Sequence, residues 1–164
     1  EVKMTIEEYN RAVEAYADNL YRFVVKNLRD EHASDDIVQD TFEKLWRKLE
    51  EVSGIKVKTY LFTTAYHTMI DHIRREKRYG VPVPGSIQDA SHSSSYSDLG
   101  EILEKAVSRL PEDQRAVVML RDYEGYSYDE IAEITDLSAS QVKVYIYRAR
   151  VNLRAYIGSM EQVI

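Results

Sequence analysis

The sequence predicts an all-α protein built from two small helical domains that a flexible linker joins. Apolar residues recur at helical spacing along most of the 164 residues, helix-capping residues precede several of these stretches, and one Ser-, Gly- and Pro-rich segment separates them. With 44% hydrophobic and 30% charged residues, the chain has enough apolar material for a core. We therefore expect a globular protein.

The composition excludes several classes of protein. The chain has no Cys and four scattered His, which excludes disulfides, thiolate metal sites and thiol catalysis and leaves little for an imidazole site. No apolar run approaches the roughly 20 residues that span a bilayer, and the N-terminal stretch is amphipathic rather than a signal sequence. We expect a soluble, cytoplasmic protein without membrane insertion, metal or cofactor.

The N-terminal domain, residues 1–78, is predicted to be a small helical bundle. We expect Ser34 to cap its second helix, where Asp35 and Asp36 then lie at the positive end, and Trp46 to be a core residue. Three apolar stripes mark the helices. They are Tyr16, Leu20, Phe23, Val24 and Leu28; then Ile37, Val38, Phe42, Leu45, Trp46 and Leu49; then Leu61, Ala65, Met69 and Ile73, flanked by Phe62 and Ile70.

Residues 79–100, YGVPVPGSIQDASHSSSYSDLG, have the composition of a linker. They hold two of the three Pro, three of the six Gly and six Ser, with no Lys or Arg. As a flexible chain this segment would span about 26 Å r.m.s., so the two domains could lie well apart. The alternative is an ordered surface loop of one domain, although unstructured loops of this length are uncommon in compact domains.

The C-terminal domain, residues 101–164, is predicted to contain four helices, at about 99–109, 112–123, 128–134 and 139–155. Pro111 suits a first helical position. Three pairs of residues, each three positions apart, have the pattern of helix-capping pairs. They are Asp98 with Glu101, Ser127 with Glu130, and Ser138 with Gln141.

The last two predicted helices have the features of a helix-turn-helix. Residues 135–138 form a short turn, Ala132 is small enough to lie where the helices cross, and residues 142–153 carry an apolar stripe, Val142, Ile146, Ala149 and Leu153. The alternative is a capped helical hairpin whose cations are only solvated. The outer face of the second helix offers groups that can contact phosphates and base edges of DNA. These are Ser140, Gln141, Lys143, Val144, Tyr147, Arg148 and Val151.

Acidic and basic residues are concentrated in different segments of the chain. The formal net charge is −6, yet residues 138–154 carry four cations and no acid, whereas residues 112–136 carry eight acids and two cations and residues 30–51 eight acids and three cations. Acidic segments repel DNA and attract basic protein surfaces. The pattern suits a protein that meets DNA beside a larger protein, because a lone duplex-binding protein depends on many phosphate contacts.

Three motifs carry a family resemblance. They are ASDDIVQDTFEKLW at 33–46, TYLFTTAYHTMIDHIRREKR at 59–78 and LPEDQRAVVMLRDYEGYSYDEIAEITDLSASQVKVYIYRARVNLR at 110–154. In this order they resemble the extracytoplasmic-function (group IV) sigma factors of the bacterial sigma-70 family, over nearly the whole chain. The resemblance implies a promoter-specificity subunit of RNA polymerase whose two helical domains are regions 2 and 4. The implied partners are core RNA polymerase, promoter DNA and an anti-sigma factor.

The resemblance also implies roles for individual residues. Asp36, Gln39 and Asp40 would dock on the clamp coiled coil of the largest polymerase subunit. The loop Ser53 to Lys58 and the helix that follows would hold the melted non-template strand of the −10 element, through Lys56, Lys58, Tyr60, His67, Arg74, Arg75, Lys77 and Arg78. The −35 element would be contacted by Ser140, Gln141, Lys143, Val144, Tyr147, Arg148 and Arg150.

Several positions depart from the family pattern. Tyr60 stands in place of a common Trp, His67 in place of a frequent Asn, and Asp136 in place of the usual Gly of the helix turn. Asp can adopt a left-handed conformation at modest cost, so we expect the turn to form. The recognition helix has Gln141, Val144 and Tyr145 in place of the more usual Thr, Ser and Arg, which leaves the promoter sequence open.

Catalytic and metal sites are the less favoured interpretations of the remaining polar residues. Asp35, Asp36 and Asp40 could suggest a carboxylate site, but no nucleophile, phosphate-binding glycine loop or base accompanies them. His67 and Asp71 lie four residues apart, and two ligands without a third make an ordinary surface pair. We expect no enzyme. The alternative function is a stand-alone helix-turn-helix transcriptional regulator.

Overall fold

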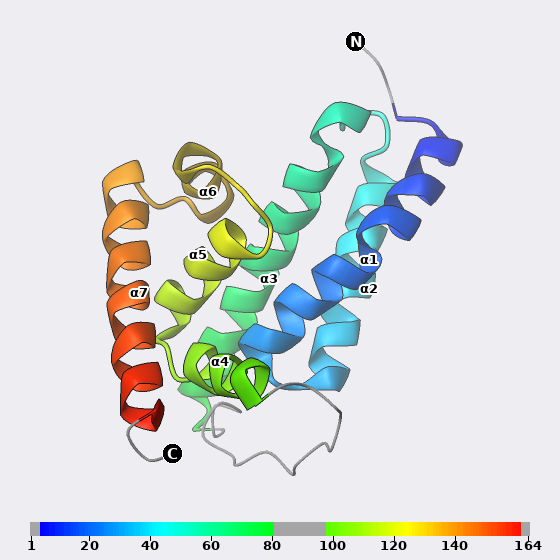
Figure 1. Ribbon diagram of the computed structural model, residues 1–164. Coiled ribbons are helices and arrows are strands. Elements are labelled where there is room, and N and C mark those ends of the chain that lie inside the picture. Colours follow the sequence, from blue (N-terminus) through cyan, green and yellow to red (C-terminus); the bar gives the residue numbers. More distant parts are fainter. Residues whose placement is uncertain (1–3, 81–97, 162–164) are drawn as a thin grey trace. The chain divides into compact units, whose positions relative to one another are not determined.

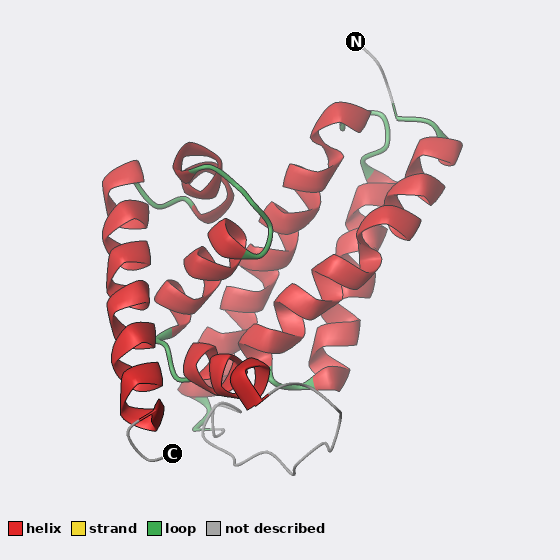
Figure 2. Cartoon of the chain, in the orientation of Figure 1, coloured by secondary structure: helices red, strands yellow, loops and turns green. Residues whose placement is uncertain are grey.

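The structure is a computed structural model that describes residues 4–80 and 98–161. These residues form seven α-helices and one short 3-10 helix, and no strand occurs among them (Figures 1 and 2). The all-α fold class is confirmed. The chain divides into two compact units, and the division lies in the stretch 81–97, outside the described residues.

The first unit is a bundle of three helices, α1 (Ile6–Leu28), α2 (Glu31–Arg47) and α3 (Val57–Arg78), with the 3-10 helix η1 (Gly54–Lys56) directly before α3. Each of the three helices packs against the other two. The predicted stripes supply the core, since their members approach zero exposure where the helices meet. The largest fully buried side chains of this unit are Leu20, Phe23, Val24, Leu45, Leu61, Phe62 and Met69.

Two expectations for α2 were wrong. Its N-cap is Asp30, whose carboxylate accepts the backbone N–H of Ala33 at 3.0 Å. Ser34 is buried one turn inside the helix, and its hydroxyl donates to the carbonyl of Asp30 at 2.7 Å. Trp46 is 48% exposed, because it lies at the margin of the apolar stripe. One side of its ring contacts the ring of Tyr9 edge-on at 5.1 Å. Trp46 is therefore a surface aromatic, and Leu45 is the buried residue at this level of the helix.

The second unit contains α4 (Asp98–Ser108), α5 (Glu112–Asp122), α6 (Tyr128–Thr135) and α7 (Ala139–Glu161), and α7 packs against the other three. Buried apolar residues from all four helices form its core. α4 begins at Asp98, so the last three residues of the predicted linker are helical, and α7 runs six residues beyond its predicted end. The core includes Ala106, Val117, Leu120, Ile131, Ile134, Val142, Ile146 and Ala149.

The helix ends of the second unit match their predicted signals closely. Ser127 and Glu130 form a reciprocal capping box, and Ser138 and Gln141 exchange the same two hydrogen bonds at 3.1 and 2.9 Å. Pro111 is the N-cap of α5 rather than its first helical residue, a difference of one position. The capping role expected of Asp98 lies outside the described side chains.

The turn between α6 and α7 forms with Asp in the usual Gly position. Asp136 has φ 60° and ψ 17°, the left-handed conformation that ends a helix. Thr135 supports the turn, because its hydroxyl accepts the backbone N–H of Leu137 at 3.4 Å. Ala132, expected where the two helices cross, is half-buried, whereas its neighbours Ile131 and Ile134 are fully buried.

Candidate functional sites

The predicted DNA-reading face of α7 is open to solvent. Val144 is 43% and Tyr147 is 67% exposed, whereas Val142, Ile146 and Ala149 on the opposite side are buried in the unit. The capping pair at Ser138 places this face in the first three turns of the helix, directly after the Asp136 turn. The structure therefore brings together six predicted contact residues as one exposed surface, the reading face: Ser140, Gln141, Lys143, Val144, Tyr147 and Arg148.

Arg150, the seventh predicted residue, follows Lys143 by about two helical turns, but it is half-buried and has a partner within the unit. Its guanidinium forms an ion pair with the Asp122 carboxylate at the end of α5, at 2.8 Å. The hydrogen bond with Asp122 raises the pKa of Arg150 above its ordinary value. Asn152, one turn of α7 away from Arg148, donates to Gln114 of α5 at 3.0 Å. Arg150 thus holds α7 to α5, and its charge is already partly neutralised.

The residues predicted for the −10 strand follow α3 along its length. Tyr60, His67 and Arg74 recur at seven-residue steps, close to two helical turns, so they lie on one side of the helix. Lys56 and Lys58 lie at one end, and Arg74, Arg75, Lys77 and Arg78 lie exposed at the other, about 30 Å away along the axis. The structure places them as a long band rather than a compact site.

A hollow beside Tyr60 is lined by three basic residues that the sequence did not predict as part of the site. It has a volume of about 360 Å³ and lies between the end of α2 and the start of α3. Lys44, Arg47 and Lys48 line one side, and Tyr60 and Thr64 line the other. The spacing of the three cations at i, i+3 and i+4 was a usable signal of one helix face. The net acidity of residues 30–51 conceals this basic face.

The acidic residues predicted to dock on the polymerase share one face of α2. Asp36 and Gln39 are exposed and Asp40 is half-buried, and positions i, i+3 and i+4 are neighbours on a helix. Asp40 pairs with Lys44 at 3.1 Å, and Asp36 lies 3.5 Å from His32. A backbone hydrogen bond at His32 and the nearby Asp36 carboxylate raise the pKa of the His32 imidazole. The face is acidic, with basic neighbours one turn away.

Two searches concern the described part of the chain, one for clusters of metal-ligating side chains and one for helices that could cross a membrane. No group of three or more His, Asp or Glu side chains is close enough to hold a metal ion there. The ring of His67 contacts the ring of Tyr66 edge-on at 5.2 Å. Within residues 4–80 and 98–161, every helix is too short or too polar to cross a bilayer.

Comparison with known families gives two matches, in the order that the motifs predicted. The sigma-70 region 2 family matches residues 12–79, and the sigma-70 region 4 family matches residues 100–153. The extracytoplasmic-function RNA polymerase sigma factor SigM of Bacillus subtilis is 29% identical over 157 residues, which cover 93% of this chain and 94% of SigM. The chain belongs to the extracytoplasmic-function group of the sigma-70 family.

Further relatives agree with this assignment. The sigma factor YlaC of Bacillus subtilis is 27% identical to this sigma factor, over 85% of this chain and 86% of YlaC. The structure also resembles the sigma factor RpoE of Bartonella quintana, solved in complex with the anti-sigma factor NepR, with a TM-score of 0.78 and 25% identity. That match covers 93% of this chain and 98% of RpoE. These relatives are sigma factors, which are not enzymes.

Proposed function

We propose that this sigma factor binds core RNA polymerase, recognises the −35 and −10 elements of a promoter set and helps to open the duplex. Residues 1–78 would act as region 2, residues 101–164 as region 4 and residues 79–100 as the linker. The observation that carries the proposal is the reading face, an exposed surface at the start of the second helix of a helix-turn-helix, in a chain that also matches region 2.

The reading face supplies the chemistry for the −35 element. A recognition helix places its N-terminal residues against base edges in the major groove. The Oε1 atom of Gln141 accepts the Ser138 N–H, and its amide nitrogen can still donate to adenine. Lys143 can hydrogen-bond guanine, and the side chain of Val144 can contact a thymine methyl group. Ser140 and Tyr147 flank these residues, and Arg148 lies one turn further on, where it can contact phosphate. We assign phosphate binding here to Arg148 in preference to Arg150, which is occupied by Asp122.

The band on α3 supplies the chemistry for the opened −10 strand. Unpaired bases stack on aromatic side chains, and their phosphates follow cations. Tyr60 lines the hollow between α2 and α3, and Lys44, Arg47 and Lys48 converge on it from the other helix. We propose that the hollow holds one unstacked nucleotide of the non-template strand. Lys56, Lys58 and His67 would contact the strand near it, and Arg74, Arg75, Lys77 and Arg78 would contact the adjoining duplex or strand.

The acidic face of α2 is proposed as the docking surface for the polymerase. Asp36, Gln39 and Asp40 offer two carboxylates and an amide to a basic partner surface. Since the similar RpoE of Bartonella quintana was solved with an anti-sigma factor, we also propose an anti-sigma factor as a partner of this chain. The role is noncatalytic and needs no cofactor. It belongs in the cytoplasm, where polymerase and promoter DNA are found.

The test is whether specific promoter binding depends on core polymerase. With a net charge of −6 and four cations on α7, the purified chain should bind promoter duplex weakly at physiological salt. Core polymerase should make the binding specific, as measured by gel shift, and run-off transcription should start only when both are present. Tight and sequence-specific binding by the chain alone would instead identify a stand-alone regulator.

A further inference from the structure

The residue Met4, just before α1, lies against the segment that joins α2 to α3. The backbone N–H of Met4 donates to the carbonyl of Leu49 at 3.1 Å, and the Met4 side chain is buried. One turn later the hydroxyl of Tyr9 donates to the carbonyl of Phe42 at 3.2 Å. The start of α1 is therefore fixed to the end of α2 and to the chain that leads into η1.

Glu8 is held in place by the cap of the same helix. The hydroxyl of Thr5 accepts the backbone N–H of Glu8 at 3.1 Å, and the Oε1 atom of Glu8 accepts the Thr5 hydroxyl at 3.2 Å and the Thr5 backbone N–H at 3.4 Å. This capping box leaves the second carboxylate oxygen, Oε2, directed away from Thr5. If the carboxylate moves aside, it gives up its two exposed hydrogen bonds with Thr5.

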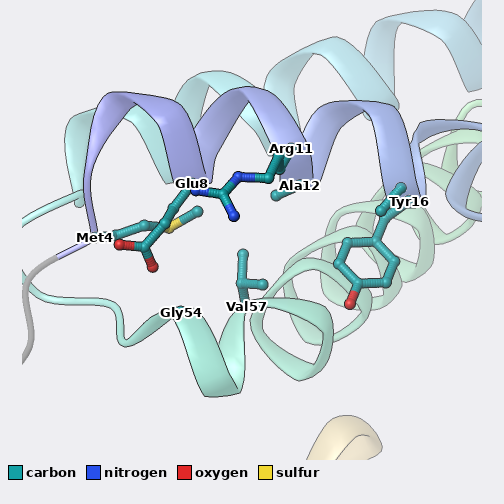
Figure 3. A pocket seen from close by; sticks show the side chains of 8 residues that line it. Met4, Glu8, Arg11, Ala12, Tyr16, Gly54 and Val57 are labelled. Atoms are coloured by element: carbon teal, nitrogen blue, oxygen red, sulfur yellow. The ribbon is translucent and has the colours of Figure 1, made fainter.

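That second oxygen occupies the space beside Gly54. A Cβ atom at position 54 would lie 2.3 Å from Oε2 of Glu8, well inside van der Waals contact. Figure 3 shows Glu8 of α1 with its carboxylate directed toward the side of the hollow where Gly54 lies. The hollow has a volume of about 260 Å³, and Met4 and Arg11 also line it. Glycine at 54 therefore lets the loop approach α1 this closely.

The opposite side of the same loop faces solvent. Ile55 is 96% exposed, the highest exposure of any large apolar residue in the described chain, and Lys56 is also exposed. The loop is thus supported on its inner side by the first turns of α1 and presents an apolar and a basic side chain outward.

We propose that residues 4–8, which lead into α1 and form its first residues, are a positioning element that sets where Ile55 and Lys56 lie against the −10 strand, and that Gly54 lets the loop fit against them. The inference rests on the proposed −10 role of the loop. It assigns a function to Met4, Glu8 and Gly54, which lie away from the band on α3. They act through the position of the loop.

A double-substitution cycle on the holoenzyme tests the contact between Glu8 and Gly54. The readout is the base preference at the −10 element, measured by run-off transcription from a library randomised there, with the −35 profile of the same holoenzyme as internal reference. Gly54→Ala should reduce −10 discrimination by about fivefold, the factor that matches a coupling of about 1 kcal/mol between contacting residues. Glu8→Ala removes the atoms that a Cβ at position 54 would meet, so the Glu8→Ala/Gly54→Ala double variant should regain most of the discrimination. The part that stays lost in it should equal the loss in Glu8→Ala alone, which measures what the Glu8 cap contributes.

Two further variants keep the outcome decisive. Gly158→Ala is the matched control, because a Cβ atom there meets nothing within 4 Å, and it should leave both profiles unchanged. Met4→Ala weakens the same support without adding an atom to the loop, so it decides the matter if Gly54→Ala fails to fold. Met4→Ala should also reduce base discrimination at the −10 element and leave the −35 profile unchanged.

The results separate this inference from the proposed function. If Ile55→Ser and Lys56→Ala leave the −10 profile unchanged, the loop does not read DNA. The proposed −10 role of the loop and its positioning by residues 4–8 then both fail. Suppose that those two variants alter the −10 profile, that the double variant discriminates no better than Gly54→Ala alone, and that Met4→Ala behaves as wild type. The loop then reads DNA without help from residues 4–8. Only the positioning inference is then overturned.

Discussion

Leu45 and Trp46 are adjacent in α2, but solvent reaches them very differently. Leu45 is 0% exposed, so Leu45→Ala should cost about 2 to 5 kcal/mol of the free energy of unfolding. Trp46→Ala removes a half-exposed ring and one edge contact with Tyr9, and such aromatic pairs contribute about 0.5 to 1.5 kcal/mol. Chemical denaturation of the two variants should give a clearly smaller loss for Trp46→Ala. Equal losses would mean that Trp46 is part of the core.

Val144 and Val151 offer a matched pair for testing the reading face. They are 43% and 42% exposed and lie two turns apart on the same side of α7. Val144→Ser should change the base preference at the −35 element, because an apolar side chain favours a thymine methyl group and a hydroxyl does not, and a good base contact is worth about 1 to 3 kcal/mol. Val151→Ser should leave the profile unchanged. Transcription from a randomised −35 library measures both.

If both Val variants keep the wild-type profile, the start of α7 does not read DNA. If Val151→Ser shifts the profile as much as Val144→Ser, the reading face extends along α7 beyond Arg148. Either result would change the assignment of residues 140–148 while leaving the fold untouched.

The two arginines of α7 that are two residues apart should behave differently. Arg148 is exposed on the reading face, whereas Arg150 is paired with Asp122 of α5. Arg148→Ala should lower the slope of log affinity against log salt concentration by about one, the loss of one phosphate contact. Arg150→Ala should change that slope less and should cost up to about 1 kcal/mol of stability, as for other half-exposed ion pairs. Promoter binding by the holoenzyme at several salt concentrations and thermal unfolding separate the two roles.

Helix positions could be predicted from the sequence because apolar spacing and caps are local signals. Ser127 and Ser138 cap the expected helices, and the Asp136 turn forms as anticipated. The error at Ser34 arose because Asp30 offers an equally good cap one turn earlier, and burial then turned the Ser34 hydroxyl to a backbone carbonyl. A cap residue alone cannot choose between two such starts.

Contacts between helices could not be predicted in the same way. Whether Arg150 is available to DNA depends on Asp122, which is 28 residues away and on another helix. The hollow beside Tyr60 likewise needs cations from α2 and an aromatic ring from α3 to converge. Apolar spacing says which side of a helix is buried, but it does not say which polar side chains meet across a groove. The exposure of Trp46 also depends on how the helices pack, so apolar spacing did not predict it.

At the scale of the whole molecule, the segregation of charge should govern the choice of partner. Reversing Asp36 and Asp40 to Lys should weaken binding to core polymerase without unfolding the chain, because both side chains lie outside the buried stripe of α2. The matched control is the same reversal at Glu14 and Asp18, which are also four residues apart and exposed, on α1. Competition with the wild-type chain for core polymerase measures the effect. Equal competition by the Asp36/Asp40 variant would remove the docking assignment.

The short connections within each unit have a consequence for how the chain folds. Connections of at most nine residues join the helices within each unit, and most contacts join residues close in sequence. Proteins with such local contacts fold within microseconds to milliseconds, whereas a ribosome adds only about 5 to 20 residues per second. The first bundle can therefore be complete on the ribosome before α7 has been synthesised. A nascent chain would then be competent to bind polymerase before it could bind a −35 element.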